Sequence, residues 1–170
     1  MIRIFIILIL ASLLWSCQKE FKTVAKVDLQ KFMGDWYVIG ILPNPIEKTA
    51  ANGIETYVLN PDSSIGITYT YRKGGPQGKV KTMHPRGRIH NHQTNAEWRV
   101  QLLKPFWFVY LVVDLADDYR YTVISVPNKK FVWIMSRSPK LSDEDYAGII
   151  QRLDADGYNT SEIIKMPQVW

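Results

Sequence analysis

Residues 34–137 repeat one pattern, in which short runs rich in β-branched and aromatic residues end in turns of Gly, Pro, Asn or Asp. There are eight such runs, at 34–42, 53–60, 65–72, 79–90, 96–103, 106–115, 119–126 and 130–137. Short turn-rich links of this kind join antiparallel neighbours. Because closing a sheet removes its exposed edges, the pattern predicts an eight-stranded antiparallel up-and-down β-barrel and an all-β fold. The fourth run contains Pro85 and Gly87, so we expect it to be bent, bulged or at an edge.

Alternation within the runs indicates one wet face and one apolar face. In 96–103 the polar side is Glu97, Arg99 and Gln101, and the opposite side is Trp98, Val100 and Leu102. In 65–72, Ile65, Ile67, Tyr69 and Tyr71 likewise oppose Thr68, Thr70 and Arg72. The run 106–115 is apolar on both sides, so another element must cover its outer face.

One helix is predicted after the eighth strand. Ser142 and Asp145 have the spacing of a capping box. Four apolar residues then follow at helical intervals and should face the barrel wall: Tyr146, Ile149, Ile150 and Leu153. Gly157 ends the helix, and residues 161–166 offer a short ninth strand.

The N-terminus has the pattern of an export signal. Arg3 precedes an apolar run from Ile4 to Trp15 that is shorter than the about 20 residues needed to span a bilayer. Residues 1–16 are therefore predicted to be a signal peptide. Cys17, the only cysteine, follows Leu-Leu-Trp-Ser, which resembles the lipobox of bacterial lipoproteins. The resemblance implies a diacylated Cys17 that anchors the chain to a membrane, residues 17–27 as lipidated N-terminus and tether, and a folded domain at 28–170. The alternative is a soluble secreted protein that loses Cys17 with its signal.

Composition and motifs exclude several functions. The formal net charge of +5 comes without a clustered Lys/Arg stripe, so we expect no nucleic-acid partner. There is no Gly-x-Ser-x-Gly, no phosphate-binding glycine loop and no Cys/His pair, so we expect neither enzymatic activity nor a cofactor. His84, His90 and His92 lack a carboxylate at ligand spacing and are expected to bind no metal.

Three motifs together resemble a known family. "GDWY" at 34–37, "DDYRYTVI" at 117–124 and "WIMSRSP" at 133–139 occur in the order and spacing of the lipocalins, and the chain is similar to the bacterial outer-membrane lipoprotein group of that family over residues 27–169. The resemblance implies a calyx with one external helix. It also implies that Trp36 of the Gly-x-Trp motif closes one end of the barrel, that Arg137 lies over it, and that Gly34 allows close backbone approach. An anion-binding role for Arg137 is the alternative.

The resemblance further implies a pocket for an apolar or amphipathic ligand above Trp36. Combined with alternation, it predicts as ligand-binding residues Val38, Gly40, Ile67, Tyr69, Tyr71, Trp98, Val100, Leu102, Tyr110, Val112, Tyr121 and Val123. The expected ligand is a fatty acid such as palmitate, or a lysophospholipid. In the alternative, these aromatic side chains fill the barrel completely.

The expected function is a lipid-binding carrier for transport or storage, anchored through acylated Cys17 in the bacterial envelope and there at the outer membrane. A calyx enzyme is the second hypothesis, with Asp114 as the carboxylate embedded in an apolar strand. A filled barrel that serves only as an interaction module is the third.

Overall fold

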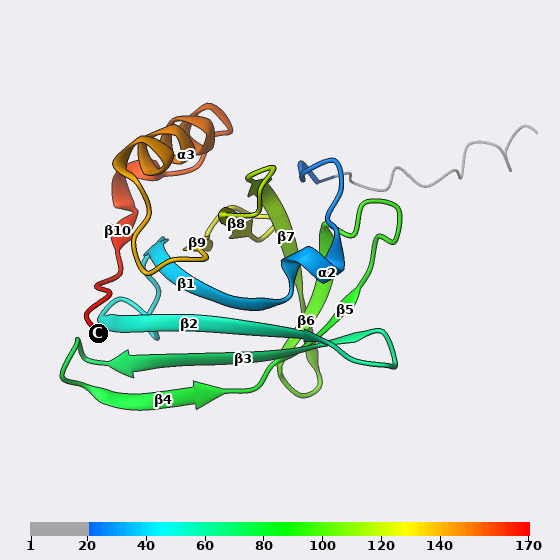
Figure 1. Cartoon of the computed structure of the whole chain (residues 1–170), viewed down its shortest axis with the longest axis horizontal. Helices are drawn as coiled ribbons and strands as arrows, with labels where there is room; N and C mark the ends of the chain where they lie inside the picture. Colours follow the sequence, from blue (N-terminus) through cyan, green and yellow to red (C-terminus); the bar gives the residue numbers. More distant parts are fainter. Residues whose placement is uncertain (1–20) are drawn as a thin grey trace, which may run out of the picture.

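The computed structural model describes residues 21–170. They form one antiparallel sheet rolled into a barrel, with a longer helix on its outer side and a short helix at one end (Figure 1). The strands are β1 (Gly34–Ile41), β2 (Ala50–Leu59), β3 (Ser64–Lys73), β4 (Lys79–Met83), β5 (Arg86–Ile89), β6 (Glu97–Leu103), β7 (Phe106–Leu115), β8 (Tyr121–Ser125), β9 (Val132–Ser136) and β10 (Ile164–Lys165). The helices are α2 (Leu29–Phe32), α3 (Asp143–Ala155) and a 3₁₀ turn (Thr160–Glu162).

Strand β1 closes the barrel, because it pairs with β2 on one side and with β9 on the other. Strands β4 and β5 both pair with β3, and His84 and Pro85 lie between them. A proline cannot donate the ladder hydrogen bond, so the two strands form one barrel strand broken at this point. The closed barrel therefore has eight strands, as predicted, and the expected bend falls at Pro85.

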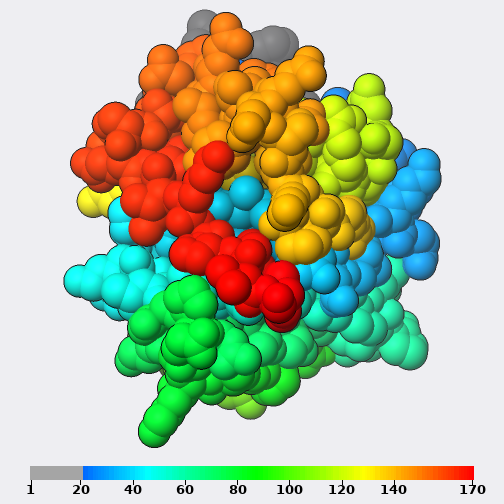
Figure 2. Space-filling view, turned by 60° about the vertical axis from the view of Figure 1, so that its left-hand side comes forward, coloured from blue at the N-terminus to red at the C-terminus, as the bar shows by residue number. Residues whose placement is uncertain are grey.

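The C-terminal segment, residues 164–169, fills an opening between β1 and β2. The pairing of these two strands ends at Tyr37 and Ile54. Strand β10 pairs antiparallel with β1 in this gap. Gln168 Nε2 donates to the carbonyls of Val38 (2.7 Å) and Gly53 (3.3 Å), one on each strand. Figure 2 shows the segment, in red, crossing the surface between α3 and the green β3–β4 turn. The expected ninth strand is thus part of a strap that holds the barrel wall together.

Helix α3 lies against the outer face of the barrel, as the sequence predicts. Ser142 caps it by accepting a hydrogen bond from the Asp145 amide (3.0 Å), and Gly157 follows its end with a φ of +76°. Its buried residues are Ile149 and Leu153. They form an outer cluster with Tyr158, which follows the helix, and with outward-facing side chains of the wall: Leu42, Ala116, Tyr121, Val123, Val132 and Ile134. None of the helices that the structure describes has the length and apolarity needed to cross a bilayer.

The barrel interior holds a separate inner cluster that is mostly aromatic and β-branched. It includes Val27, Phe32, Trp36, Val38, Tyr57, Ile65, Ile67, Tyr69, Tyr71, Trp98, Tyr110, Val112, Ile124 and Met166. The backbone amide of Val27 donates to the Thr94 carbonyl (2.7 Å), which ties the N-terminal part of the described chain to the barrel. Residues 21–170 thus contain every strand of the barrel, its core and its covering helix. The predicted signal peptide and Cys17 lie outside the described residues.

Candidate ligand-binding site

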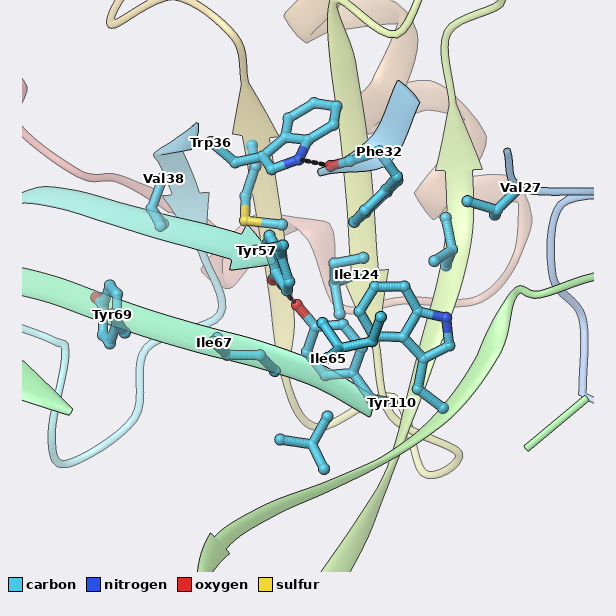
Figure 3. Close-up of a cluster of buried hydrophobic side chains, with 14 of the residues drawn as sticks. Val27, Phe32, Trp36, Val38, Tyr57, Ile65, Ile67, Tyr69, Tyr110 and Ile124 are labelled. Atoms are coloured by element: carbon cyan, nitrogen blue, oxygen red, sulfur yellow. Dashed lines mark hydrogen bonds between the residues drawn. The ribbon is translucent and has the colours of Figure 1, made fainter. Parts of the chain in front are cut away.

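An aromatic floor closes one end of the barrel. Trp36 is fully buried, and its indole Nε1 donates to the Phe32 carbonyl of helix α2 (2.8 Å; Figure 3). The Phe32 ring meets Trp36, Tyr57 and Trp98 at centroid distances of 5.1, 5.5 and 5.4 Å. Large rings in tilted and edge-to-face contact fill the narrow end of a small barrel.

Arg137 covers this floor from outside. Its guanidinium lies 3.7 Å from the centroid of the Trp36 ring, and it donates to the carbonyls of Asp35 (2.8 Å) and Lys31 (2.6 Å). A Cβ at Gly34 would lie 3.5 Å from Nη1 of Arg137, and the φ of Gly34, +94°, is one that L side chains rarely adopt. Burial lowers the pKa of the Arg137 guanidinium from its ordinary value. Both terminal nitrogens are used on backbone carbonyls, which is a structural role rather than anion binding.

A cavity of about 650 Å³ lies above the floor. Its volume is within the range of pockets for small ligands, and its wall is mostly apolar. It is lined by Asn44, Ile46, Glu47, Glu55, Ile67, Tyr69, Met83, Pro85, Val100, Leu102, Trp107, Phe108, Val109, Tyr110, Val126, Pro127, Asn128, Phe131 and Trp133. The aromatic side chains therefore do not fill the interior.

The predicted pocket residues fall into three groups. Five line the cavity: Ile67, Tyr69, Val100, Leu102 and Tyr110. Four belong to the inner cluster without lining the cavity: Val38, Tyr71, Trp98 and Val112. Three lie on the outer side of the wall: Gly40, Tyr121 and Val123.

The outward position of Gly40 corrects the expected alternation along β1. The register of β1 with β9 shifts between Val38, which is opposite Met135, and Gly40, which is opposite Ile134. This bulge inserts one residue and reverses which side chains point inward. A Cβ at Gly40 would accordingly meet Tyr146 of α3 at 3.4 Å, so the glycine makes room for the helix rather than for a ligand.

Tyr121 and Val123 also face outward, contrary to the prediction. Strand β7 has a bulge between Val112 and Asp114, and Ile124 is the β8 residue that pairs with Val112 inside the barrel. Tyr121 and Val123 consequently pack under α3. Both faces of β8 are buried, so the sequence offers no polar residue that marks the outer side.

A buried carboxyl that the sequence analysis did not single out lines the cavity. Glu55 of β2 is 8% exposed. Its Oε2 accepts hydrogen bonds from the hydroxyls of Tyr57 and Tyr110, which also contact each other (Figure 3 shows the two phenols). The pKa of Glu55 is raised from 4.5 to about 7: burial raises it most, the Glu47 carboxylate also raises it, and the hydrogen bonds from the two phenols lower it.

A second carboxylate, Glu47, enters the cavity from the β1–β2 loop. Asn44 holds the loop: its Oδ1 accepts from the Glu47 amide (3.0 Å), and its Nδ2 donates to Glu47 Oε2. Trp133 Nε1 donates to both carboxylate oxygens, at 3.2 and 3.1 Å. The Tyr69 hydroxyl is buried and has no hydrogen-bond partner among residues 21–170, and burial and the Glu47 carboxylate raise its pKa.

Sequence signals for these carboxylates differ. Glu55 shares a face of its strand with Tyr57, so alternation places it inside once Tyr57 is known to be buried. Glu47 lies in a loop, where no periodicity applies. Asp114 is the carboxylate on which the calyx-enzyme hypothesis depends. It lies outside the barrel, where Nε of Arg152 on α3 donates to it at 2.9 Å. Within residues 21–170 no three His, Cys, Asp or Glu side chains lie together as metal ligands.

The open end carries an apolar rim. Seven side chains there are exposed by more than a third of their area: Ile46, Leu102, Leu103, Phe106, Trp107, Phe108 and Phe131. Most of them belong to the β6–β7 hairpin, and the Arg88 guanidinium lies 4.4 Å from the Trp107 ring centroid. Contiguous exposed apolar side chains of this kind mark interaction sites.

A closed antiparallel barrel with a sealed floor and an open apolar cavity defines a binding protein for small hydrophobic ligands. The family model of the lipocalin-like domain matches residues 27–168. The chain therefore belongs to the lipocalin-like domain family.

Curated relatives and solved structures agree with this membership. The chain is 24% identical to the temperature-induced lipocalin-1 of Arabidopsis thaliana, over 89% of this chain and 84% of the relative. It is 25% identical to the outer membrane lipoprotein Blc of Escherichia coli K12, over 85% of this chain and 81% of the relative. Among solved structures, apocrustacyanin C2 superposes with a TM-score of 0.68 at 15% identity (84% of this chain, 80% of that one). Insecticyanin from Manduca sexta also has a TM-score of 0.68, at 18% identity (86% and 84%). These two structures bear on the fold alone.

Proposed function

We propose that this protein is a membrane-anchored carrier that holds a single-chain lipid, a fatty acid or lysophospholipid, for transport or storage in the bacterial envelope. The observation that carries the proposal is the cavity of about 650 Å³, which is mostly apolar and opens at an apolar rim. Each buried CH₂ contributes about 0.8 kcal/mol, so an acyl chain gains on the order of 10 kcal/mol before association and ordering costs. A net affinity around micromolar suits a carrier that must also release its ligand.

The rim supports exchange with a lipid surface. Lys104 lies in the exposed turn of the β6–β7 hairpin, and Lys130 lies in the neighbouring β8–β9 turn. Apolar side chains flanked by lysines favour contact with a surface of anionic lipid. The relatives named outer membrane lipoprotein support an envelope location, and acylation of Cys17 would hold the barrel there.

Ligand titration of residues 18–170 tests the proposal. After delipidation, a lysophospholipid or palmitate should bind saturably, with a change in fluorescence from Trp107 and Trp133, which line the cavity. Val100→Trp should weaken binding at least tenfold by occupying the cavity. Arg99→Trp, next to it on the outer face of β6, is the matched control and should bind normally. If neither lipid binds, the carrier proposal is wrong.

The anchor is tested separately. Cys17→Ser should release the full chain from membranes into the soluble fraction. Membrane retention equal to that of the unmodified chain would contradict lipidation, while leaving lipid binding by the barrel unaffected.

One observation favours a second function. Glu55 has a pKa near 7 and lies between two phenols in an apolar cavity, an arrangement suited to general acid–base catalysis. Lipocalins are generally binding proteins, so the carrier remains the first proposal. Ligand recovered chemically unchanged after long incubation supports the carrier. Conversion that disappears in Glu55→Gln but persists in Asp114→Asn would support the enzyme.

A further inference from the structure

The charge of the cavity is one-sided. Among the described residues that line it, Glu47 and Glu55 are carboxylates and none is Lys, Arg or His. Both side chains are more than nine-tenths buried. An anionic head group that entered this cavity would therefore meet like charge and find no cation, which is costly where water is excluded.

The two carboxylates differ in how fully they are satisfied. Glu47 accepts from Asn44 and Trp133 through both of its oxygens. Glu55 receives both phenol bonds on Oε2, and its Oε1 makes no hydrogen bond with any residue in 21–170. This oxygen therefore faces the cavity rather than the packed wall. A ligand that fills the cavity displaces water from Oε1, and leaving the acceptor unpaired then costs free energy, so a ligand that supplies a donor to Oε1 is favoured over one that does not.

The remaining groups around Glu55 bring no positive charge. Tyr57 comes from its own strand, Tyr110 from β7 and Tyr69 from β3, and Glu47 reaches it from the β1–β2 loop. Three phenols and a second carboxylate surround the acid. The protein itself therefore supplies no counter-ion for Glu55 in its ionised form.

We infer that the cavity selects a single-chain amphiphile whose head group is a protonated amine, which enters head-first and donates to Glu55 next to Glu47. This inference rests on the proposed function, because it assumes that the cavity takes a one-chain lipid. It refines the ligand class: an alkylammonium is preferred to a fatty acid of the same length. The apolar tail then lies along Ile67, Val100 and Leu102 toward the rim.

Three ligands with one tail test the inference: dodecylamine, dodecanol and laurate, each kept below its micelle concentration. Binding to residues 18–170, which contain the whole barrel, is measured at pH 8 by tryptophan fluorescence and by displacement of a neutral apolar dye. Dodecylamine should bind about tenfold or more tightly than laurate, the low end of the coupling measured for close charge pairs in protein interfaces. Dodecanol should fall between them.

The pH supplies a second readout on the unmodified chain. Between pH 8 and pH 5.5 Glu55 gains a proton, because its pKa is about 7. The preference for dodecylamine over laurate should therefore shrink at the lower pH, whereas dodecanol binding should stay constant. In the reverse direction, bound dodecylamine should lower the pKa of Glu55, which ¹³C NMR of the labelled carboxyl measures directly.

Isosteric variants assign the effect to the carboxylates. Glu55→Gln should reduce the amine-to-laurate preference about tenfold, and Glu47→Gln should reduce it in the same direction. Glu144→Gln, which removes an exposed carboxylate at the start of α3, is the control and should change nothing. Near-ultraviolet circular dichroism checks that each variant is folded, and the pH series on the unmodified chain stands independently of them.

The outcomes separate the two proposals. If none of the three ligands binds and lysophospholipid also fails, the carrier function is wrong and this inference with it. If laurate binds as tightly as dodecylamine at pH 8, the carrier survives and the amine inference is overturned. An amine preference that persists in both Glu55→Gln and Glu47→Gln would likewise overturn the assignment to these residues.

Discussion

The buried acid Glu55 should make the stability of this barrel depend on pH in an unusual direction. Most carboxylates in folded proteins are stabilised as anions, so stability falls as the pH is lowered through their pKa. Glu55 behaves oppositely, because burial among phenols and beside Glu47 favours its protonated form. Ionising it in the folded state costs free energy that the unfolded chain does not pay.

The magnitude follows from the pKa. The pKa of Glu55 is about 7 in the folded protein and 4.5 for the ordinary side chain. As the pH rises, the unfolded chain therefore releases this proton at a lower pH than the folded protein does. The stabilisation is fully present below pH 4.5 and is lost as the pH rises through 7. The loss amounts to roughly 3 kcal/mol by pH 8, at about 1.4 kcal/mol for each pKa unit, and ordinary stabilities are only 5–15 kcal/mol.

Urea unfolding of delipidated residues 18–170 at pH 5 and pH 8 measures this effect. Between pH 5 and pH 8 the unfolding free energy of the unmodified chain should fall by about 2.5 kcal/mol more than that of Glu55→Gln, because a part of the total is already lost between pH 4.5 and pH 5. The comparison of variants cancels the contribution of the other carboxylates, including Asp62 and Asp145, whose pKa values are lowered by hydrogen bonds. Identical pH dependence in the two chains would refute the reasoning, and Glu144→Gln should match the unmodified chain.

Three further substitutions test the packing. Arg137→Ala should lower the unfolding free energy by about 1–2 kcal/mol, because it removes the cation over Trp36 and two bonds to carbonyls at a half-buried site; a loss no larger than that of an exposed lysine variant would argue against it. Gly53→Ala places a Cβ 2.6 Å from Met166 Sδ and should cost about 1–3 kcal/mol in thermal unfolding, whereas unchanged stability would mean that the C-terminal strap is loose. Leu153→Ala should cost about 2–4 kcal/mol by leaving a cavity under α3, and an effect like that of an exposed helix position would contradict its burial.

Long, regular patterns in the sequence predicted the architecture well. Eight alternating runs, a capped helix with apolar residues at i, i+3, i+4 and i+7, and three family motifs led to the barrel, its outer helix and the Trp36–Arg137 pair. The barrel strands and the helix depend on local periodicity, so the chain carries that information within short segments. The Trp36–Arg137 pair joins distant residues and was implied by the resemblance to the lipocalins.

The sequence by itself therefore determined the barrel, the aromatic floor and five of the residues that line the cavity. These five lie on β3, β6 and β7. The tertiary structure alone decided the phase of β1 and β8. A one-residue bulge reverses the inward face of β1, and both faces of β8 are buried, so neither phase leaves a mark in the sequence pattern. It also decided the chemistry of the cavity, since Glu47 comes from a loop and Glu55 meets Tyr110, 55 residues further along the chain, only in the folded barrel. Contacts between distant segments set the pKa of a buried acid, and no local sequence pattern records them.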